Sequence, residues 1–159
     1  MIQSDRILPS VLLATLTTVA LPAFGAQPAE SQRMMAYKSP NCGCCEDWIA
    51  HLERNGFDVR AEDTHHINAI KQENNLPREM ASCHTALIDG YVIEGHVPAA
   101  DIKAFLEAEE HAFGEETLGL AVPGMPHGTP GMETGRQDDY KVFSFTADGE
   151  TDVFKSYTF

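Results

Sequence analysis

Three of the four cysteines in this chain lie within four consecutive residues, Cys42-Gly43-Cys44-Cys45. Cys42 and Cys45 have the Cys-x-x-Cys spacing, which places two sulfur atoms a helical turn apart, where they can form a disulfide or chelate a metal. A helix beginning here would point its free N–H groups and the positive end of its dipole at these sulfurs, which stabilises thiolate over thiol. The motif therefore predicts thiol redox chemistry or the binding of a soft metal ion.

The third cysteine, Cys44, favours the metal. A dithiol oxidoreductase needs two sulfurs, and a third thiol between them would invite mispairing. Several thiolates in one helical turn suit a shared soft metal, and thiolates select Cu(I), zinc or iron–sulfur clusters. Two alternatives stay open: an oxidoreductase with Cys42 as nucleophile and Cys45 as resolving thiol, and structural disulfides, one of them to Cys83.

The remaining cysteine and one histidine extend the predicted ligand set. Cys83 immediately precedes a predicted strand whose start, in a thioredoxin-like fold, lies beside the Cys-x-x-Cys turn. His96 follows the next strand, and imidazole binds copper and zinc alike, although a structural histidine is an equal alternative. A structural zinc site is the less favoured interpretation, because such a site is complete with four ligands and this sequence offers more than four soft donors. The predicted metal ligands are Cys42, Cys44, Cys45, Cys83 and His96.

A segment rich in glycine and proline, residues 114–136, holds a second group of soft donors, Met125, His127 and Met132. Thioether sulfur binds Cu(I) without losing a proton and cannot be consumed by a disulfide. We therefore predict these three residues as secondary metal ligands, the alternative being that the methionines only pack the loop on the domain. A loop of this length in a compact domain is usually functional or disordered.

The elements that must position these residues follow from hydrophobic periodicity and from turn and cap signals. Asn41 is the predicted N-cap of the first helix, and Thr64 could cap the second. The Asp89-Gly90 and Asp148-Gly149 dipeptides each predict a hairpin turn. The predicted elements are strands at 34–39, 57–61, 85–88, 91–94, 140–145 and 151–157, and helices at 42–54, 64–75 and 98–110. This order predicts an α/β, thioredoxin-like fold with a mixed sheet flanked by helices and a C-terminal β-hairpin.

Composition and the N-terminus limit location and partners. Residues 1–25 have the pattern of a secretory signal peptide: Arg6, an apolar stretch and small residues around Ala23-Phe24-Gly25. Residues 26–33 are predicted as a flexible leader and 34–159 as the metal-binding domain, with no membrane anchor after cleavage. The less favoured alternative is that residues 1–25 stay in place as an uncleaved membrane anchor. The formal net charge of −13 disfavours nucleic acid and anionic membranes and attracts metal cations.

The stretches YKSPNCGCCEDWIAHLERNGF, EMASCHTALIDGYVIEGHVPAADI and GLAVPGMPHGTPGME together resemble the CopG-type copper-resistance family. The resemblance runs from about residue 35 to residue 154. It implies a periplasmic protein with a thioredoxin-like fold that binds copper, in some members several sulfur-bridged ions, through Cys42, Cys44, Cys45, Cys83 and His96. Such a protein would sequester Cu(I) and exchange it with other periplasmic copper-handling proteins. A copper oxidoreductase role is the alternative that the resemblance also carries.

Overall fold

The computed structural model describes residues 33–159, which form one mixed sheet with helices on both faces. The predicted signal peptide, and the predicted leader apart from its last residue, Arg33, lie outside the described residues. Within residues 33–159 no helix is long and apolar enough to cross a membrane. The elements are β1 (Arg33–Lys38), α1 (Gly43–Arg54), β2 (Asp58–Asp63), α2 (Ile67–Glu73), η1 (Arg78–Met80), β3 (Thr85–Ile88), β4 (Tyr91–Glu94), α3 (Ala99–Leu106), η2 (Gly114–Glu116), β5 (Thr117–Ala121), β6 (Tyr140–Thr146) and β7 (Thr151–Tyr157).

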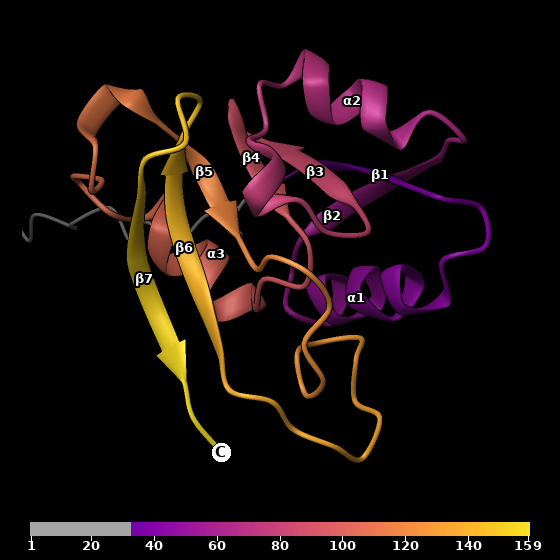
Figure 1. The fold of residues 1–159 in the computed structure, drawn as a ribbon. Helices are drawn as coiled ribbons and strands as arrows, with labels where there is room; N and C mark the ends of the chain where they lie inside the picture. Colours follow the sequence, from indigo (N-terminus) through magenta and orange to yellow (C-terminus); the bar gives the residue numbers. More distant parts are fainter. Residues whose placement is uncertain (1–32) are drawn as a thin grey trace, which may run out of the picture.

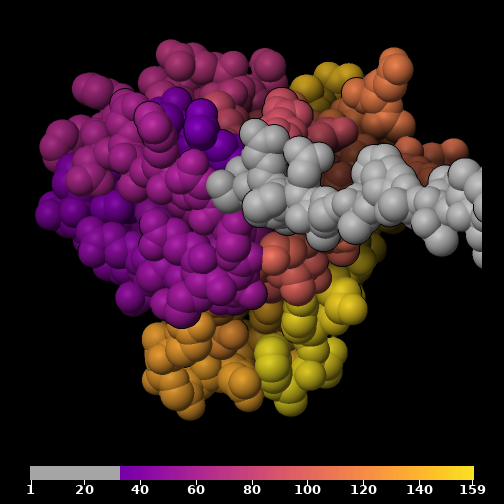
Figure 2. Space-filling model, turned by 180° about the vertical axis from the view of Figure 1, so that it is seen from behind, coloured from indigo at the N-terminus to yellow at the C-terminus, as the bar shows by residue number. Residues whose placement is uncertain are grey.

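The seven strands have the order β2-β1-β3-β4-β5-β6-β7 (Figure 1). β1 pairs parallel with β2 across the α1 connection and antiparallel with β3, and the β3–β4 hairpin turns at Asp89-Gly90 as predicted. β4 pairs parallel with β5, while β6 and β7 form the predicted C-terminal hairpin. Seen from behind in Figure 2, the N-terminal part of the described residues lies beside the yellow C-terminal strands. Orange residues of the connection before β6 lie below this part and beside the lower end of the yellow strands.

Alternation along the strands divides the apolar side chains between two cores, because successive residues of a strand point to opposite faces. The larger core packs Trp48 and Leu52 of α1 and Ile102 and Phe105 of α3 against one face of the sheet. The smaller core, around Val92 and Phe145, lies on the other face beside Met80 of η1. The cysteine-bearing helix α1 is thereby fixed to the sheet by a fully buried tryptophan and leucine.

Three sequence-based boundaries were wrong. The second helix was expected to begin at a Thr64 cap, but α2 begins at Ile67 with His66 as its N-cap. Residues 117–121 were assigned to the long loop, yet they form β5, a central strand between β4 and β6. The third helix was expected to reach Glu110 but ends at Leu106, since the acidic residues that follow have no apolar face to bury and oppose the negative end of the helix dipole. The connection between β5 and β6, residues 122–139, is therefore the true extent of the glycine-rich loop.

Candidate metal centre

The Cys-x-Cys-Cys motif lies where β1 turns into α1. Pro40 and Asn41 form the turn, and the Cys42 N–H donates to the Ser39 carbonyl over 3.0 Å. Cys42, not the predicted Asn41, is the N-cap residue, and no side chain caps the helix. The first N–H groups of α1 therefore have no side-chain cap and lie at the helix end that carries the sulfurs, where a helix N-terminus stabilises negative charge.

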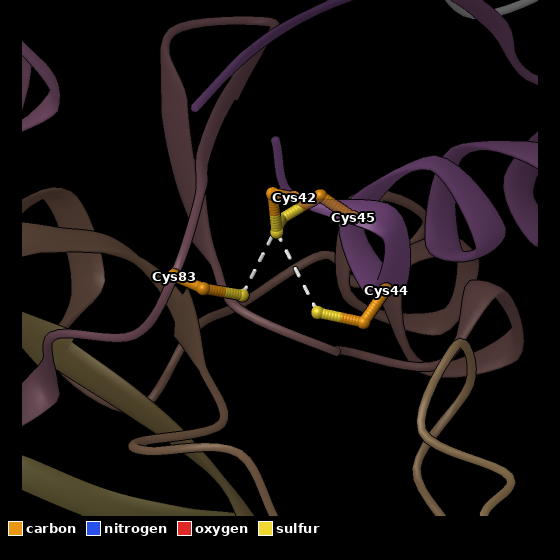
Figure 3. Close-up of side chains that lie close together, drawn as sticks. All are labelled: Cys42, Cys44, Cys45 and Cys83. Carbon is orange, nitrogen blue, oxygen red and sulfur yellow. Dashed lines mark hydrogen bonds between the residues drawn. A yellow bond between two sulfur atoms is a disulfide. The ribbon is translucent and has the colours of Figure 1, made fainter. Parts of the chain in front are cut away.

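Four sulfurs meet at this helix end (Figure 3). Cys42 and Cys45 form a disulfide, whereas Cys44 and Cys83 carry free thiols. The Cys44 Sγ lies 3.5 Å from the Cys42 Sγ, and the Cys83 Sγ lies 3.5 Å from the Cys45 Sγ. Their ligand atoms all lie within 4.8 Å of one another, so one metal or a small group of metals could contact all four once the disulfide is reduced. We call Cys42, Cys44, Cys45 and Cys83 the sulfur cluster.

Cys83 also belongs to a second donor group, which we call the imidazole cluster: Cys83, His84 and His96. The Cys83 Sγ lies 3.2 Å from the His84 Nδ1 and 3.1 Å from the His96 Nε2. Both histidines are almost completely buried, with exposed fractions of 1% and 0%. The two clusters share one thiol, so a metal bound in either is adjacent to the other.

The imidazoles are held by groups outside the two clusters. The His84 ring lies against the Trp48 indole with centroids 4.2 Å apart, and Trp48 donates its Nε1–H to the Val97 carbonyl over 2.9 Å. The His96 Nδ1 lies 2.8 Å from the Pro130 carbonyl oxygen. The His84 Nε2 is buried with no hydrogen-bond partner among the described residues, although a buried polar atom normally has one.

Burial sets the protonation of these groups. It lowers the pKa of His84 well below its ordinary value, and the neighbouring His96 and Lys71 act in the same direction. Burial also lowers the pKa of His96, against the opposing effect of the Pro130 carbonyl. The pKa of the Cys83 thiol is raised to about 12, first by burial and then by Cys44. The imidazoles are thus neutral donors at neutral pH, and a metal that binds Cys83 must displace its proton.

A buried ion pair supports the segment that carries Cys83 and His84. The Lys71 Nζ contacts Glu94 Oε1, and Glu94 is completely buried. Glu94 also accepts hydrogen bonds from the Ser82 N–H (2.6 Å) and the Thr85 hydroxyl (2.7 Å). Burial raises the pKa of Glu94, while the Lys71 ammonium opposes that shift. One carboxylate therefore ties both ends of residues 82–85 to α2.

The predicted secondary ligands lie in the glycine-rich loop. His127 directs its Nδ1 to the Thr134 hydroxyl (2.6 Å), and it belongs to no group of three or more His, Cys, Asp or Glu donors within residues 33–159. Met125 has an exposed fraction of 52%, and Met132 is half-buried. The loop itself reaches the site through its backbone at Pro130. The role of these three side chains as ligands stays a prediction.

Sequence reasoning placed Cys83 and His96 in the site but left out His84, although His84 directly follows Cys83. The sequence signal was that adjacency to a candidate thiolate ligand, whereas the burial of His84 is seen only in the structure. Three further histidines lie outside both clusters. His65 and His66 are exposed, and His111 bonds the Tyr91 hydroxyl over 2.9 Å.

Comparison with known proteins adds an independent line of evidence. A family model described as a protein of unknown function, DUF411, matches residues 80–132, which include Cys83, His84 and His96. Two solved structures of a copper resistance protein, copG, also match. Form 2 is 45% identical with a TM-score of 0.74 and covers 81% of this chain and 100% of that chain. Form 1 is 46% identical with a TM-score of 0.73, and the corresponding coverages are 80% and 98%. No curated protein sequence matched.

Proposed function

The chain belongs to the CopG family of copper resistance proteins, and on that premise we propose that it is an exported protein that binds Cu(I) for copper resistance. The ligands are Cys42, Cys44, Cys45, Cys83 and His96, and we add His84 to them. Such a protein would hold copper and pass it to other copper-handling proteins of the periplasm. Its loop donors Met125, His127 and Met132 would serve as secondary ligands.

The observation that carries the proposal is that three sulfurs and two neutral imidazoles gather around the Cys83 thiol, which belongs to both clusters. Thiolates favour soft Cu(I), and imidazole binds copper as well, so the donor set fits this metal. The His84 Nδ1, which lies 3.2 Å from the Cys83 Sγ, is the ring nitrogen placed to coordinate beside that thiol. Zinc is a less favoured occupant, because a closed site of four ligands would leave two of these donors unused.

Fold and location belong to the same proposal. We infer a thioredoxin-like domain over residues 34–159, because β1, α1 and β2 form a parallel unit whose helix begins at the Cys-x-x-Cys motif. The disulfide between Cys42 and Cys45 suits an oxidising compartment outside the cytoplasm. Export would require the signal peptide predicted at residues 1–25, followed by the leader at 26–33.

The disulfide also imposes a condition on binding. A disulfide sulfur is a poor metal ligand, so the sulfur cluster offers four thiolates only after Cys42 and Cys45 are reduced. That reduction takes two electrons and two protons, for example from a dithiol that becomes a disulfide in turn. The imidazole cluster needs no reduction, since neither His84 nor His96 takes part in the disulfide.

Cu(I) titration of the reduced, metal-free protein against a competing Cu(I) chelator tests the proposal. We expect stoichiometric, tight binding that disappears when all four cysteines are replaced by serine. Weak binding at less than one copper per chain would contradict it. Purification with zinc alone, together with unfolding on chelation, would favour the structural zinc site.

A second function, a thiol or copper oxidoreductase using Cys42 and Cys45, is favoured by one observation: these two cysteines form a disulfide at the N-terminus of α1. In the copper reaction two Cu(II) ions each take one electron from the Cys42 and Cys45 thiolates, giving two Cu(I) ions and the disulfide. Insulin reduction by the metal-free protein tests the thiol reaction: turnover that survives Cys44→Ser and Cys83→Ser but not Cys42→Ser would favour this function.

A further inference from the structure

We propose that the glycine-rich loop, residues 122–139, acts on the metal centre through its backbone: the Pro130 carbonyl sets the tautomer of His96, and Gly131 holds that carbonyl against α1. Pro130 and Gly131 would then be positioning residues, distinct from the side-chain donors of the same loop. This inference concerns the copper site proposed above. It rests on that proposed function only where it predicts a change in copper affinity.

The first step concerns the two nitrogens of His96. A carbonyl oxygen can only accept a hydrogen bond, so the 2.8 Å contact with Pro130 requires the proton on Nδ1. In a neutral imidazole the other nitrogen, Nε2, then carries the lone pair. That nitrogen lies 3.1 Å from the Cys83 Sγ, facing both donor clusters. The carbonyl therefore presents the nitrogen that a metal needs at the position where the metal would bind.

The second step concerns what fixes the carbonyl. Gly131 has a φ of +83°, a left-handed conformation, and sits directly on the first turns of α1. A Cβ at Gly131 would lie 2.5 Å from the Cys44 carbonyl oxygen and 2.8 Å from the Trp48 nitrogen. These are backbone atoms of a packed helix, and they cannot move aside as a flexible side chain can. Glycine is required here both for its conformation and for the close approach.

The loop around this contact is shaped by its own hydrogen bonds. The Met132 N–H donates to the Thr129 carbonyl over 2.8 Å, and the Gly128 N–H donates to the Met132 carbonyl over 2.9 Å. The Thr129 hydroxyl, which is buried, donates to the Pro126 carbonyl over 2.8 Å. The position of the Pro130 carbonyl thus follows from the loop and α1 together. The loop backbone thus touches α1 at Gly131 and the His96 ring at the Pro130 carbonyl.

The same loop contains a matched control. Gly135 also has a φ of +83°, but a Cβ added there would meet nothing within 4 Å. Gly135→Ala therefore introduces the same backbone strain in the same loop without the collision with α1. Any difference between the alanine variants at positions 131 and 135 reports the close approach alone.

The tautomer is measured first, on the metal-free protein, from the ¹⁵N chemical shifts of the His96 ring in long-range ¹H–¹⁵N NMR spectra. We expect a protonated Nδ1 and an unprotonated Nε2 in the wild type and in Gly135→Ala. Gly131→Ala should raise the share of the Nε2–H form. A wild-type protein with the proton on Nε2 would overturn the proposal. The wild-type measurement needs neither copper nor a variant that folds, so it separates the proposal from the proposed function.

Copper affinity is measured next, by competition with a Cu(I) chelator on reduced protein. We expect Gly131→Ala to weaken binding by about 10–100-fold, the usual cost of losing an outer group that orients a metal-binding histidine, and Gly135→Ala to change it little. In a His96→Gln background, Gly131→Ala should cause no further loss, because the carbonyl then has no imidazole to orient. Equal losses in the two glycine variants, or an undiminished loss in the His96→Gln background, would overturn the proposal.

Discussion

The two donor clusters share Cys83 but are built in opposite ways. Three members of the sulfur cluster lie in one turn at the N-terminus of α1, where only Cys45 is fully buried. The imidazole cluster joins residues from the ends of two strands, and both of its histidines are buried against Trp48 and the loop backbone. The first cluster can close on itself as a disulfide, whereas the second has a single sulfur.

Because of this difference, oxidation and structural support act on different parts of the same metal centre. An oxidant removes Cys42 and Cys45 from the sulfur cluster without breaking a contact of the imidazole cluster. The geometry of the imidazole cluster depends instead on the sheet, on the ion pair and hydrogen bonds of Glu94, and on the glycine-rich loop. We therefore expect redox changes to alter the first cluster, and changes in the supporting framework to alter the second.

The largest effect should come from removing Glu94, whose carboxylate supports the segment that carries Cys83 and His84. Glu94→Ala leaves the Lys71 ammonium without its partner and two donors of residues 82–85 unsatisfied, so the free energy of unfolding should fall by about 3–5 kcal/mol. Urea denaturation of metal-free protein measures this. Glu107→Ala, which replaces an exposed glutamate at the end of α3, is the control. A loss equal to that of the control would show that the ion pair does not support the centre.

The next effect distinguishes the helix sulfurs from the loop sulfurs. Cys45→Ser removes a buried sulfur that touches Cys83, and should weaken Cu(I) binding by more than about 100-fold, beyond the usual cost of losing a supporting group. Met132→Leu should weaken it less and should not change the stoichiometry. Chelator competition on the two variants measures both values. Equal losses would make the loop a primary source of ligands.

A smaller effect tests whether the imidazole cluster is independent of oxidation. Protein oxidised to the Cys42–Cys45 disulfide should bind fewer Cu(I) ions than reduced protein, but retain weak binding at Cys83, His84 and His96. His84→Asn should weaken this residual binding by about tenfold. His65→Asn, at an exposed position, is the matched control. Complete loss of copper from the oxidised wild type would mean that the two clusters act as one.

The smallest effect concerns pH and a histidine outside both clusters. The His51 Nε2 accepts the Ala99 N–H at the start of α3 over 3.1 Å, which requires a neutral ring. Burial and Arg54 lower the pKa of His51 from 6.5, whereas Glu133 opposes them. The unfolded chain therefore takes up this proton first as the pH falls, and the stability of the folded protein decreases below about pH 6.5.

Thermal unfolding of metal-free wild type and His51→Gln between pH 7 and pH 5 checks this prediction. The variant should lose less stability between pH 7 and pH 5. Only the wild type has the His51 imidazole, whose lowered pKa makes the stability depend on pH in this interval. The lowered pKa values of His84 and His96 act in the same direction and remain in both proteins. Parallel profiles for the two proteins would show that His51 does not contribute.

Local signals in the sequence were enough to predict most elements, because the Asp-Gly turns and the apolar periodicity are short-range features. β5 was missed because Gly119 resembles a loop residue. In the structure that glycine lets the Val92 backbone approach so closely that a Cβ would overlap it, and this is a long-range requirement. His84 was missed for a similar reason: its burial beneath Trp48 depends on the packing of α1 and cannot be read from neighbouring residues.

Trp48 gives the centre an optical reporter. It is the only tryptophan of the chain, and its ring lies 4.2 Å from the ring of His84. All indole fluorescence of the protein therefore originates beside the imidazole cluster, with no second emitter to subtract. Filling of the site, or displacement of His84, can be followed in real time on unlabelled protein by the intensity and wavelength of a single emission band.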